Sequence, residues 1–397
     1  MKQLRIPFYF TILISAFVIY ACNSDDETGG ATTTPPVNSI QASAVIENYA
    51  NLVFTNYQEA FDAATALQTA LTAFTDNPTQ ETFDAAKTAW LAAREPYGQT
   101  EAFRFANGPI DDVNGPEGLL NAWPLDENYV DYVEGNPNAG IINDPVSFPS
   151  IDAATLEGSN ELGGEANVSV GYHAIEFLLW GQDNTAPLDQ MAGQRPFTDF
   201  VDGGTASNQD RRRMYINVCA QLILDNLQSL LDEWEPGGSY RTTFLALDEN
   251  TALRNILTGI ATLSRSELAG ERVFVAFDNQ DQEDEHSCFS DNTHRDLRLN
   301  LAGIANVYRG SFATVNGASL EDLITQADAT LGAAITAQLE AAETATEATA
   351  IPFDFAISST ETRPDVLTAV NALRALGDQF AAGGTALGIS VSSDLPE

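Results

Sequence analysis

The chain has 397 residues, enough for a sizeable hydrophobic core and for more than one ordinary domain. It carries 56 acidic and 18 basic side chains, a formal net charge of -38, and a surface of this sign repels nucleic acid and anionic lipid headgroups. The composition therefore argues against a nucleic-acid partner. It is compatible with cation binding, although an acidic excess is also typical of a solvated exterior.

The first 21 residues have the pattern of a bacterial lipoprotein signal peptide. Lys2 and Arg5 flank the start of an almost unbroken apolar run over residues 6–20, which is short for a membrane span. The run ends in Ile-Tyr-Ala-Cys, which resembles a lipobox in which Cys22 becomes the lipid-modified first residue. The acidic residues 23–27 resemble a surface-export signal, and the alternative is a merely acidic tether. We therefore expect an outer-membrane lipoprotein of the cell envelope, anchored through Cys22.

The first half of the chain begins with a tether and two long helices. Residues 22–39 are rich in Gly, Thr, Pro and Ser, a composition typical of a flexible linker. Apolar residues then recur every three or four positions up to residue 71, which predicts a long helix. Asn77 is expected to cap a second helix, in which Arg94 and Glu101 share nearly the same inward face. That face either lines a pocket or buries an ion pair such as Arg94–Glu101.

The rest of the chain alternates irregular stretches with further helices. Gly-Pro and Trp-Pro steps break the helical period from residue 103, and a Gly-, Asn- and Pro-rich stretch continues to residue 170. This predicts long ordered loops, which are often functional. The helical period returns in four segments, residues 211–234, 250–278, 320–347 and 363–382. Because no segment alternates like a strand, the sequence predicts an all-α protein built from helix bundles.

A short helix is predicted over residues 171–181, Gly-Tyr-His-Ala-Ile-Glu-Phe-Leu-Leu-Trp-Gly. His173 and Glu176 stand three positions apart, so both side chains project from one helix face within reach of a single ion. Most of the other residues are apolar around the whole circumference, which predicts burial, and Gly181 offers a C-cap. The same spacing also fits a core histidine that is hydrogen-bonded to a neighbouring carboxylate.

A second candidate site lies in residues 283–296, which hold two of the three histidines in the chain. Glu285, His286 and His294 combine carboxylate and imidazole groups, a set that suits iron, zinc or manganese. The alternative is an acidic loop in which one of residues 290–292 caps a helix running through His294. Apart from Cys22, the chain has only Cys219 and Cys288, which could pair or remain as thiols.

These motifs together resemble the imelysin family, and its iron-regulated branch most closely. The run 171–181 resembles the family's G-x-H-x-x-E signature, and Trp90-x3-Arg94, residues 100–111, 120–127 and 284–308 add to the likeness, which spans about residues 45–385. The resemblance implies two four-helix bundles related by duplication across a cleft, and a role in iron uptake. We place the bundles at residues 40–240 and 241–397. The resemblance assigns His173 and Glu176 as the metal or active-site pair, and it assigns Arg94, Glu101, Asp111 and residues 285–294 as cleft positions.

The family is also catalogued as a metallopeptidase group, but no complete zinc-protease motif is present. A zincin needs H-E-x-x-H and an inverzincin H-x-x-E-H, whereas Phe177 follows Glu176 here. A third zinc ligand would have to come from a distant residue such as Glu101, Glu285 or His286.

Our leading hypothesis is therefore a non-enzymatic lipoprotein that binds iron, another divalent metal or an iron-bearing ligand in the cleft and works with iron-uptake proteins. The alternatives are a metal-dependent peptidase that uses the same cleft, and an adhesin or assembly scaffold. In the scaffold, His173 and Glu176 would only close a buried hydrogen bond.

Overall fold

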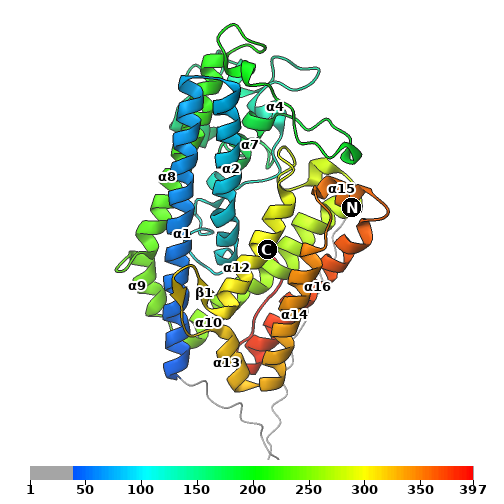
Figure 1. The fold of residues 1–397 in the computed structure, drawn as a ribbon. Coiled ribbons are helices and arrows are strands. Elements are labelled where there is room, and N and C mark those ends of the chain that lie inside the picture. The colour runs from blue at the N-terminus through cyan, green and yellow to red at the C-terminus, as the bar shows by residue number, and fades with distance from the viewer. Residues whose placement is uncertain (1–38, 397) are drawn as a thin grey trace, which may run out of the picture. The chain divides into compact units, whose positions relative to one another are not determined.

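The computed structural model describes residues 39–396, which fold almost entirely as helices (Figure 1). Four long or central helices form a first group: α1 (Ser39–Asp76), α2 (Gln80–Thr100), α7 (Gly171–Trp180) and α8 (Gln209–Trp234). Helix α1 packs against α2 and α8, and α7 packs against α8 and α2. Their inward faces are apolar, as the three-to-four-residue period predicts, and α7 is buried on every side.

Short elements fill the chain between α2 and α8 and just after it, where ordered loops were predicted. They are η1 (Glu101–Phe103), α3 (Glu117–Leu120), α4 (Glu127–Val130), α5 (Gly140–Asn143), α6 (Ala153–Ser159), η2 (Pro187–Asp189), η3 (Phe197–Phe200) and α9 (Ser239–Leu245). Between α2 and α8, no element apart from α7 is longer than 7 residues, in agreement with the many Gly and Pro residues there.

A second group is built from the C-terminal helices. Its first member is helical without a break through α10 (Glu249–Thr262), the π-helical segment η4 (Leu263–Phe274) and α11 (Val275–Asn279). The other long members are α12 (Thr293–Arg309), α14 (Ala329–Glu347) and α16 (Arg363–Ala386), and α16 packs against α14, α10 and η4. Shorter pieces complete the group: η5 (Gln282–Asp284), α13 (Leu320–Ala327), α15 (Phe353–Ser358) and the hairpin β1 (Ser311–Phe312) with β2 (Val315–Asn316).

The two groups meet where α12 packs against α2. Gly303 on α12 permits a close approach, because a Cβ atom there would lie 2.3 Å from the carbonyl oxygen of Gln99. Asn300, one turn earlier, donates from Nδ2 to the carbonyl oxygen of Gly98 at 2.9 Å. This contact places the polar side chains of α2 against those of α12, and the candidate site is built around it.

The all-α prediction is confirmed, with differences at particular helix ends. Asn77 was expected to cap α2, but its N–H bonds to the carbonyl oxygen of Ala73 at 3.2 Å, so it belongs to the last turn of α1. Thr79 is the cap instead, in a reciprocal capping box with Thr82. The helix predicted over residues 320–347 is two helices, because Asp328 ends α13 and its side chain accepts from the N–H groups of residues 330 and 331 to begin α14.

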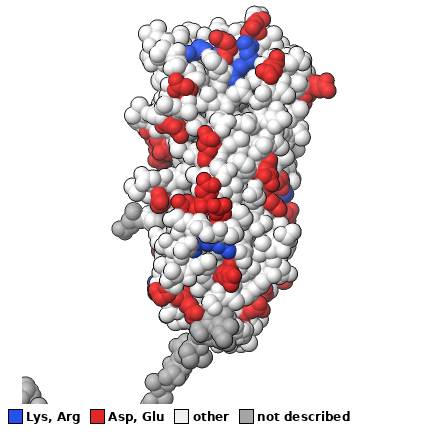
Figure 2. Space-filling model, turned by 90° about the vertical axis from the view of Figure 1, so that its left-hand side faces the viewer, with Lys and Arg blue, Asp and Glu red and all other residues white. Residues whose placement is uncertain are grey.

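Further predictions concern the cysteines, the N-terminal segment and the surface charge. Cys219 and Cys288 are both free thiols, so they do not form a disulfide. The signal peptide, Cys22 and nearly all of the tether lie outside residues 39–396, although Ser39 already belongs to α1. Within that range no helix is both long and apolar enough to cross a bilayer. Acidic side chains outnumber basic ones on the face drawn in Figure 2, as the composition predicts.

Candidate functional site

The signature helix α7 holds His173 and Glu176 in direct contact. His173 Nδ1 lies 2.8 Å from Glu176 Oε2, and both side chains are buried. The helix begins at Gly171, where φ is +86° and a Cβ atom would lie 2.6 Å from the carbonyl oxygen of Leu120. Trp90 Nε1 on α2 donates to the carbonyl oxygen of Tyr172 at 2.9 Å, and Gly181 closes the helix with a positive φ, as predicted. The first glycine of the motif thus permits α7 to approach α3.

Burial shifts the pKa values of both groups in this histidine–carboxyl pair. Burial raises the pKa of Glu176 to about 8, and hydrogen bonds from Ser290 lower it only in part. The backbone N–H of Ser290 donates to Glu176 Oε1 at 3.0 Å, and its hydroxyl donates to the same atom at 2.6 Å. Burial and the nearby Arg94 lower the pKa of His173 to about 3. The two groups therefore form a neutral hydrogen bond and not an ion pair.

His286 forms a second histidine–carboxylate pair, with Asp296 of α12. His286 Nδ1 lies 2.8 Å from Asp296 Oδ2, and the Ser287 hydroxyl donates to the same oxygen. Arg94 on α2 donates from Nη2 to Asp296 Oδ1 at 3.0 Å. Burial alone would raise the pKa of Asp296, but Arg94 and His286 hold it well below its usual range. Because an ionised carboxylate only accepts, His286 Nδ1 is the donor and Nε2 carries a lone pair.

The sequence suggested an ion pair between Arg94 and Glu101, and the structure gives each a different partner. Arg94 pairs with Asp296, and Arg272 of η4 donates to Glu101 Oε2 at 2.6 Å. Burial opposes ionisation of Glu101, but Arg272 and Arg104 lower its pKa to about 2. Both arginines therefore link the first helix group to the second. Arg94 and Glu101 both form buried ion pairs, one of the two alternatives for this face, but with partners from α12 and η4, which lie far away in sequence.

Asn121, at the end of α3, connects the two buried networks. Its Oδ1 accepts from Arg94 Nη1 at 2.7 Å, and its Nδ2 donates to Glu101 Oε1 at 3.2 Å. The same Nδ2 lies 3.4 Å from His286 Nε2. The amide therefore orients Arg94, Glu101 and His286 at once.

The two histidine pairs lie side by side. The rings of His173 and His286 are in edge contact, with centroids 4.7 Å apart. His173 Nε2 is buried and has no hydrogen-bond partner. A buried polar atom without a partner is costly, so such an atom in a native site calls for an explanation. In both pairs Nδ1 contacts a carboxylate, the arrangement that orients the opposite nitrogen of metal-binding histidines.

A pocket of about 380 Å³ opens beside His286, between the two helix groups. Asn121 and Trp123 line it from the first group, and Arg272 lines it from η4. Its wall is strongly acidic, with Glu117, Glu161, Glu165, Glu267 and Glu271. His173 is not part of the wall. Its ring contacts the ring of the wall residue His286.

Asp111 lies in a charge cluster around Arg104 and does not contact either histidine pair. Arg104 Nε is 3.4 Å from Asp111 Oδ1, and Arg104 Nη1 is 3.2 Å from Glu117 Oε1 and 3.5 Å from a Glu101 oxygen. Burial raises the pKa of Glu117 to about 7, although Arg104 opposes the rise. The cluster forms a polar flank of the pocket.

The remaining predicted site residues are not brought into the pocket. His294 Nδ1 lies 2.9 Å from the carbonyl oxygen of Asp291, so this histidine contacts the backbone just before α12. Asn292 is the N-cap position of α12, but its side chain makes no capping hydrogen bond. Glu285 is buried, and its carbonyl oxygen accepts from Trp123 Nε1 at 2.7 Å. Burial and then Asp354 raise the pKa of Glu285 well above its usual range.

Sequence reasoning missed several residues that complete the site. Asp296, Arg272 and Asn121 are buried and hydrogen-bonded to predicted residues, whereas Ser290, which donates to Glu176, lies within the predicted stretch 285–294. Asp296 and Asn121 stood inside segments that resemble the family, and Arg272 stood outside them. A charged or amide residue within such a segment can be recognised from the sequence as a candidate site residue, but its partner cannot.

Comparison with known proteins identifies the family. The family model described as Imelysin, of the peptidase M75 group, matches residues 53–380. The chain belongs to the imelysin family. It is 26% identical over 339 residues to "Iron-regulated protein A" of Synechococcus elongatus, covering 82% of this chain and 81% of that protein.

A solved structure shares the fold. The crystal structure of a protein described as an iron-regulated protein A precursor, from Parabacteroides distasonis, superposes with a TM-score of 0.71 at 20% sequence identity. The match covers 89% of this chain and 97% of the other. Membership of the imelysin family and the all-α fold are therefore established for this chain.

Proposed function

We propose that this imelysin-family protein binds iron, as the ion or as a small chelate, in the pocket between its two helix groups. His286 and His173 would supply imidazole ligands, and Glu176 and Asp296 would orient them. The observation that carries the proposal is the adjacent pair of histidines, each held through Nδ1 by a buried carboxyl group, with His173 Nε2 left without a partner. Imidazole nitrogen is a good ligand for iron.

The pocket wall supports a cationic or chelated cargo. The glutamates around the opening favour a cation electrostatically. Arg272 also lines the wall, and a guanidinium can pair with the carboxylates of a small chelate. A volume of about 380 Å³ lies within the usual range for small-molecule sites. Two imidazoles leave most positions around an iron ion open, so ligands of the chelate or water would complete its coordination.

A zinc peptidase fits these residues less well. A catalytic zinc normally has three protein ligands and one open position. Within residues 39–396, the only three His, Cys, Asp or Glu ligand atoms within 4.8 Å of one another belong to Asp183, Asp291 and Asp354, outside the pocket. We therefore derive no hydrolytic step, although the family is grouped with peptidases.

The wider setting is part of the same proposal. We infer that the protein is an outer-membrane lipoprotein anchored through Cys22, with residues 40–240 and 241–397 as its two bundles, and that it passes iron to uptake proteins. The names of its relatives, which describe iron-regulated proteins, support the link to iron.

Calorimetric titration of the full chain tests the proposal, with ferrous ion under anaerobic conditions and ferric citrate as separate probes. Replacing the two proposed ligand histidines, by His286→Gln and His173→Gln, should weaken iron binding by at least about 10-fold. His294→Gln is the matched control, since the third histidine contacts only the start of α12, and it should bind like wild type. Circular dichroism checks that each variant is folded. Unchanged iron affinity in the folded His286 and His173 variants would overturn the proposal.

A further inference from the structure

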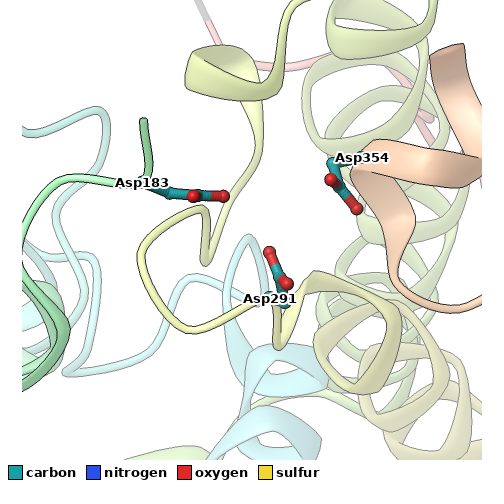
Figure 3. A group of neighbouring side chains, drawn as sticks. All are labelled: Asp183, Asp291 and Asp354. Carbon is teal, nitrogen blue, oxygen red and sulfur yellow. The ribbon is translucent and has the colours of Figure 1, made fainter. Parts of the chain in front are cut away.

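Three aspartates from distant parts of the chain meet outside the iron pocket. Asp183 follows the end of α7, Asp291 precedes α12, and Asp354 lies in α15. One carboxylate oxygen of each lies within 4.8 Å of the others. Figure 3 shows the three carboxylates gathered around a common gap, each from a different segment. Like charges repel, so this convergence needs a compensating group.

Two of these carboxylates are buried with an oxygen that has no partner. Asp183 Oδ1 accepts from the N–H and the hydroxyl of Thr185 at 3.0 and 2.8 Å, but its Oδ2 is buried without a hydrogen bond. Asp354 Oδ1 accepts from the N–H of Phe355 at 2.6 Å, and its Oδ2 is equally unpartnered. The two residues are 4% and 1% exposed. Bulk water therefore does not solvate the two bare oxygens.

The surroundings add negative charge and no basic side chain. Both carboxyl oxygens of the buried Glu285 lack a hydrogen-bond partner, and Asp354, Asp291 and Asp183 all raise its pKa. Among the residues the structure describes, none of these four acids forms an ion pair with lysine, arginine or histidine. Elsewhere in the fold, buried acids such as Asp131 are paired with arginines. The aspartate cluster lacks such a cation from the protein itself.

We propose that Asp183, Asp291 and Asp354 form a binding site for a divalent cation, and that calcium is the ion that fits. All the ligand atoms are carboxylate oxygens, which hard cations prefer. Calcium binds oxygens at about 2.3–2.6 Å, so two ligands on opposite sides of the ion lie up to about 5 Å apart. Three oxygens that all lie within 4.8 Å of one another can therefore reach one calcium ion. Magnesium needs shorter bonds, about 2.0–2.1 Å, and a near-ideal octahedron.

A cation here would fasten the segments that shape the iron pocket without belonging to it. Asp291 is the neighbour of Ser290, whose N–H and hydroxyl both bond to Glu176. Gln282 already ties the Asp183 segment to the same loop, because its Nε2 donates to the carbonyl oxygen of Asp183 at 2.7 Å. The ion would therefore hold the end of α7, the loop before α12 and α15 together. The role is structural, and it does not depend on iron binding.

The test is titration of the full chain, stripped of metal by a chelator, with calcium and with magnesium. Wild type should bind one calcium ion per chain and bind magnesium more weakly. Asp183→Asn and Asp354→Asn should weaken calcium binding by at least about 100-fold, since each removes a charged ligand. Asp189→Asn, an exposed acid in the same loop, is the matched control and should leave binding unchanged. Calcium should raise the melting temperature of wild type and of the control only.

Loss of calcium binding can be distinguished from loss of folding in these variants. Without calcium, each Asn variant removes a repelling charge, so it should melt at or above the wild-type temperature. Asp291→Asn provides a third variant, at a half-buried position. The backbone there is left-handed, a conformation that asparagine also tolerates. No calcium binding in wild type, or binding that all three variants retain, would overturn the proposal.

The iron and calcium sites can be told apart in the same samples. Asp354→Asn should lose calcium and keep iron binding, whereas His286→Gln should lose iron and keep calcium. If iron itself binds at the aspartates, iron binding will fall in Asp354→Asn and persist in His286→Gln. That result would contradict the proposed iron site and the assignment of the aspartates to calcium.

Discussion

The two histidine–carboxyl pairs have the same geometry and opposite electrostatics. In each, Nδ1 lies 2.8 Å from a carboxyl oxygen, and burial lowers the histidine pKa to about 3. Asp296 also forms an ion pair with Arg94 and stays ionised, whereas Glu176 accepts the Ser290 hydrogen bonds but forms no ion pair with an arginine, and burial raises its pKa to about 8. The comparison indicates that direct contact with a guanidinium, together with hydrogen bonds from His286 and Ser287, keeps the buried Asp296 charged.

The difference changes what each histidine can do. Beside ionised Asp296, His286 keeps its proton on Nδ1 and presents a lone pair at Nε2. Beside protonated Glu176, the proton lies between Oε2 and Nδ1, and a carboxyl O–H that donates to Nδ1 leaves N–H at Nε2. A metal at His173 Nε2 therefore requires Glu176 to ionise, with release of a proton. A metal at His286 Nε2 has only to displace the 3.4 Å contact with Asn121 Nδ2 and needs no proton release, whereas binding at His173 depends on protonation.

The largest expected effect comes from neutralising the charged pair. Asp296→Asn should lower the free energy of unfolding by about 3–5 kcal/mol, because Arg94 would remain buried without a charged partner. Equilibrium urea denaturation measures the change. Asp378→Asn, which removes a largely exposed partner of Arg265, is the matched control and should stay within about 0.5 kcal/mol of wild type. A similar small loss in both variants would mean that Asp296 does not compensate Arg94.

The second effect is the pH dependence that the raised pKa of Glu176 predicts for the metal-free protein. Between the unfolded value of 4.5 and about 8, the folded state keeps a proton that the unfolded state has released, so stability falls as pH rises. From pH 6.5 to 8, the contribution of Glu176 to this fall should reach up to about 2 kcal/mol, and the unfolded-state titration of His173 and His286, which starts from 6.5, is common to wild type and to a Glu176 variant. Glu176→Gln removes this proton exchange and should abolish the fall.

The informative quantity is the difference between the wild-type and Glu176→Gln stability profiles. Other carboxyls that titrate in this range, such as Glu117 and Asp291, contribute to both proteins and cancel. The groups that act on Glu176 are Ser290, Arg94 and Asp296, and all are retained in the variant. Parallel profiles over pH 6.5–8 would show that Glu176 is already ionised in the folded protein.

The smallest expected effect concerns the hydrogen bonds from Ser290 to Glu176. Ser290→Ala removes the hydroxyl donor to Glu176 and should cost about 1 kcal/mol. Because Ser290 lowers the pKa of Glu176, the variant should also move the pH-dependent fall to higher pH. Ser229→Ala, at an exposed serine of α8, is the control for both measurements. An unchanged pH profile in Ser290→Ala would remove Ser290 from the account.

Local pattern predicted most of the fold. Helix α7, its Gly181 cap and the contact between His173 and Glu176 follow from spacing within one or two turns. Helix α8 was predicted to begin at residue 211 and begins at 209. The break at Asp328 was missed because apolar residues continue with a helical period on both sides, and a single side chain ends one helix and caps the next.

Partner choice across the fold could not be predicted in the same way. Arg94 and Asp296 are 202 residues apart in sequence, and they meet only because Gly303 brings α12 close to α2. The aspartate cluster gave no signal either, since neither Asp183 nor Asp354 has a His, Cys, Asp or Glu next to it in the sequence. Chemistry that depends on three distant segments is visible only after the helices are packed.

X-ray absorption at the iron edge of the iron-loaded full chain tests the central claim most directly. The sample should carry Asp354→Asn, so that the aspartate cluster does not contribute iron of its own. We predict imidazole nitrogen in the first coordination shell, reduced by His286→Gln and by His173→Gln and unchanged by His294→Gln. An all-oxygen shell that none of the histidine variants alters would contradict the account.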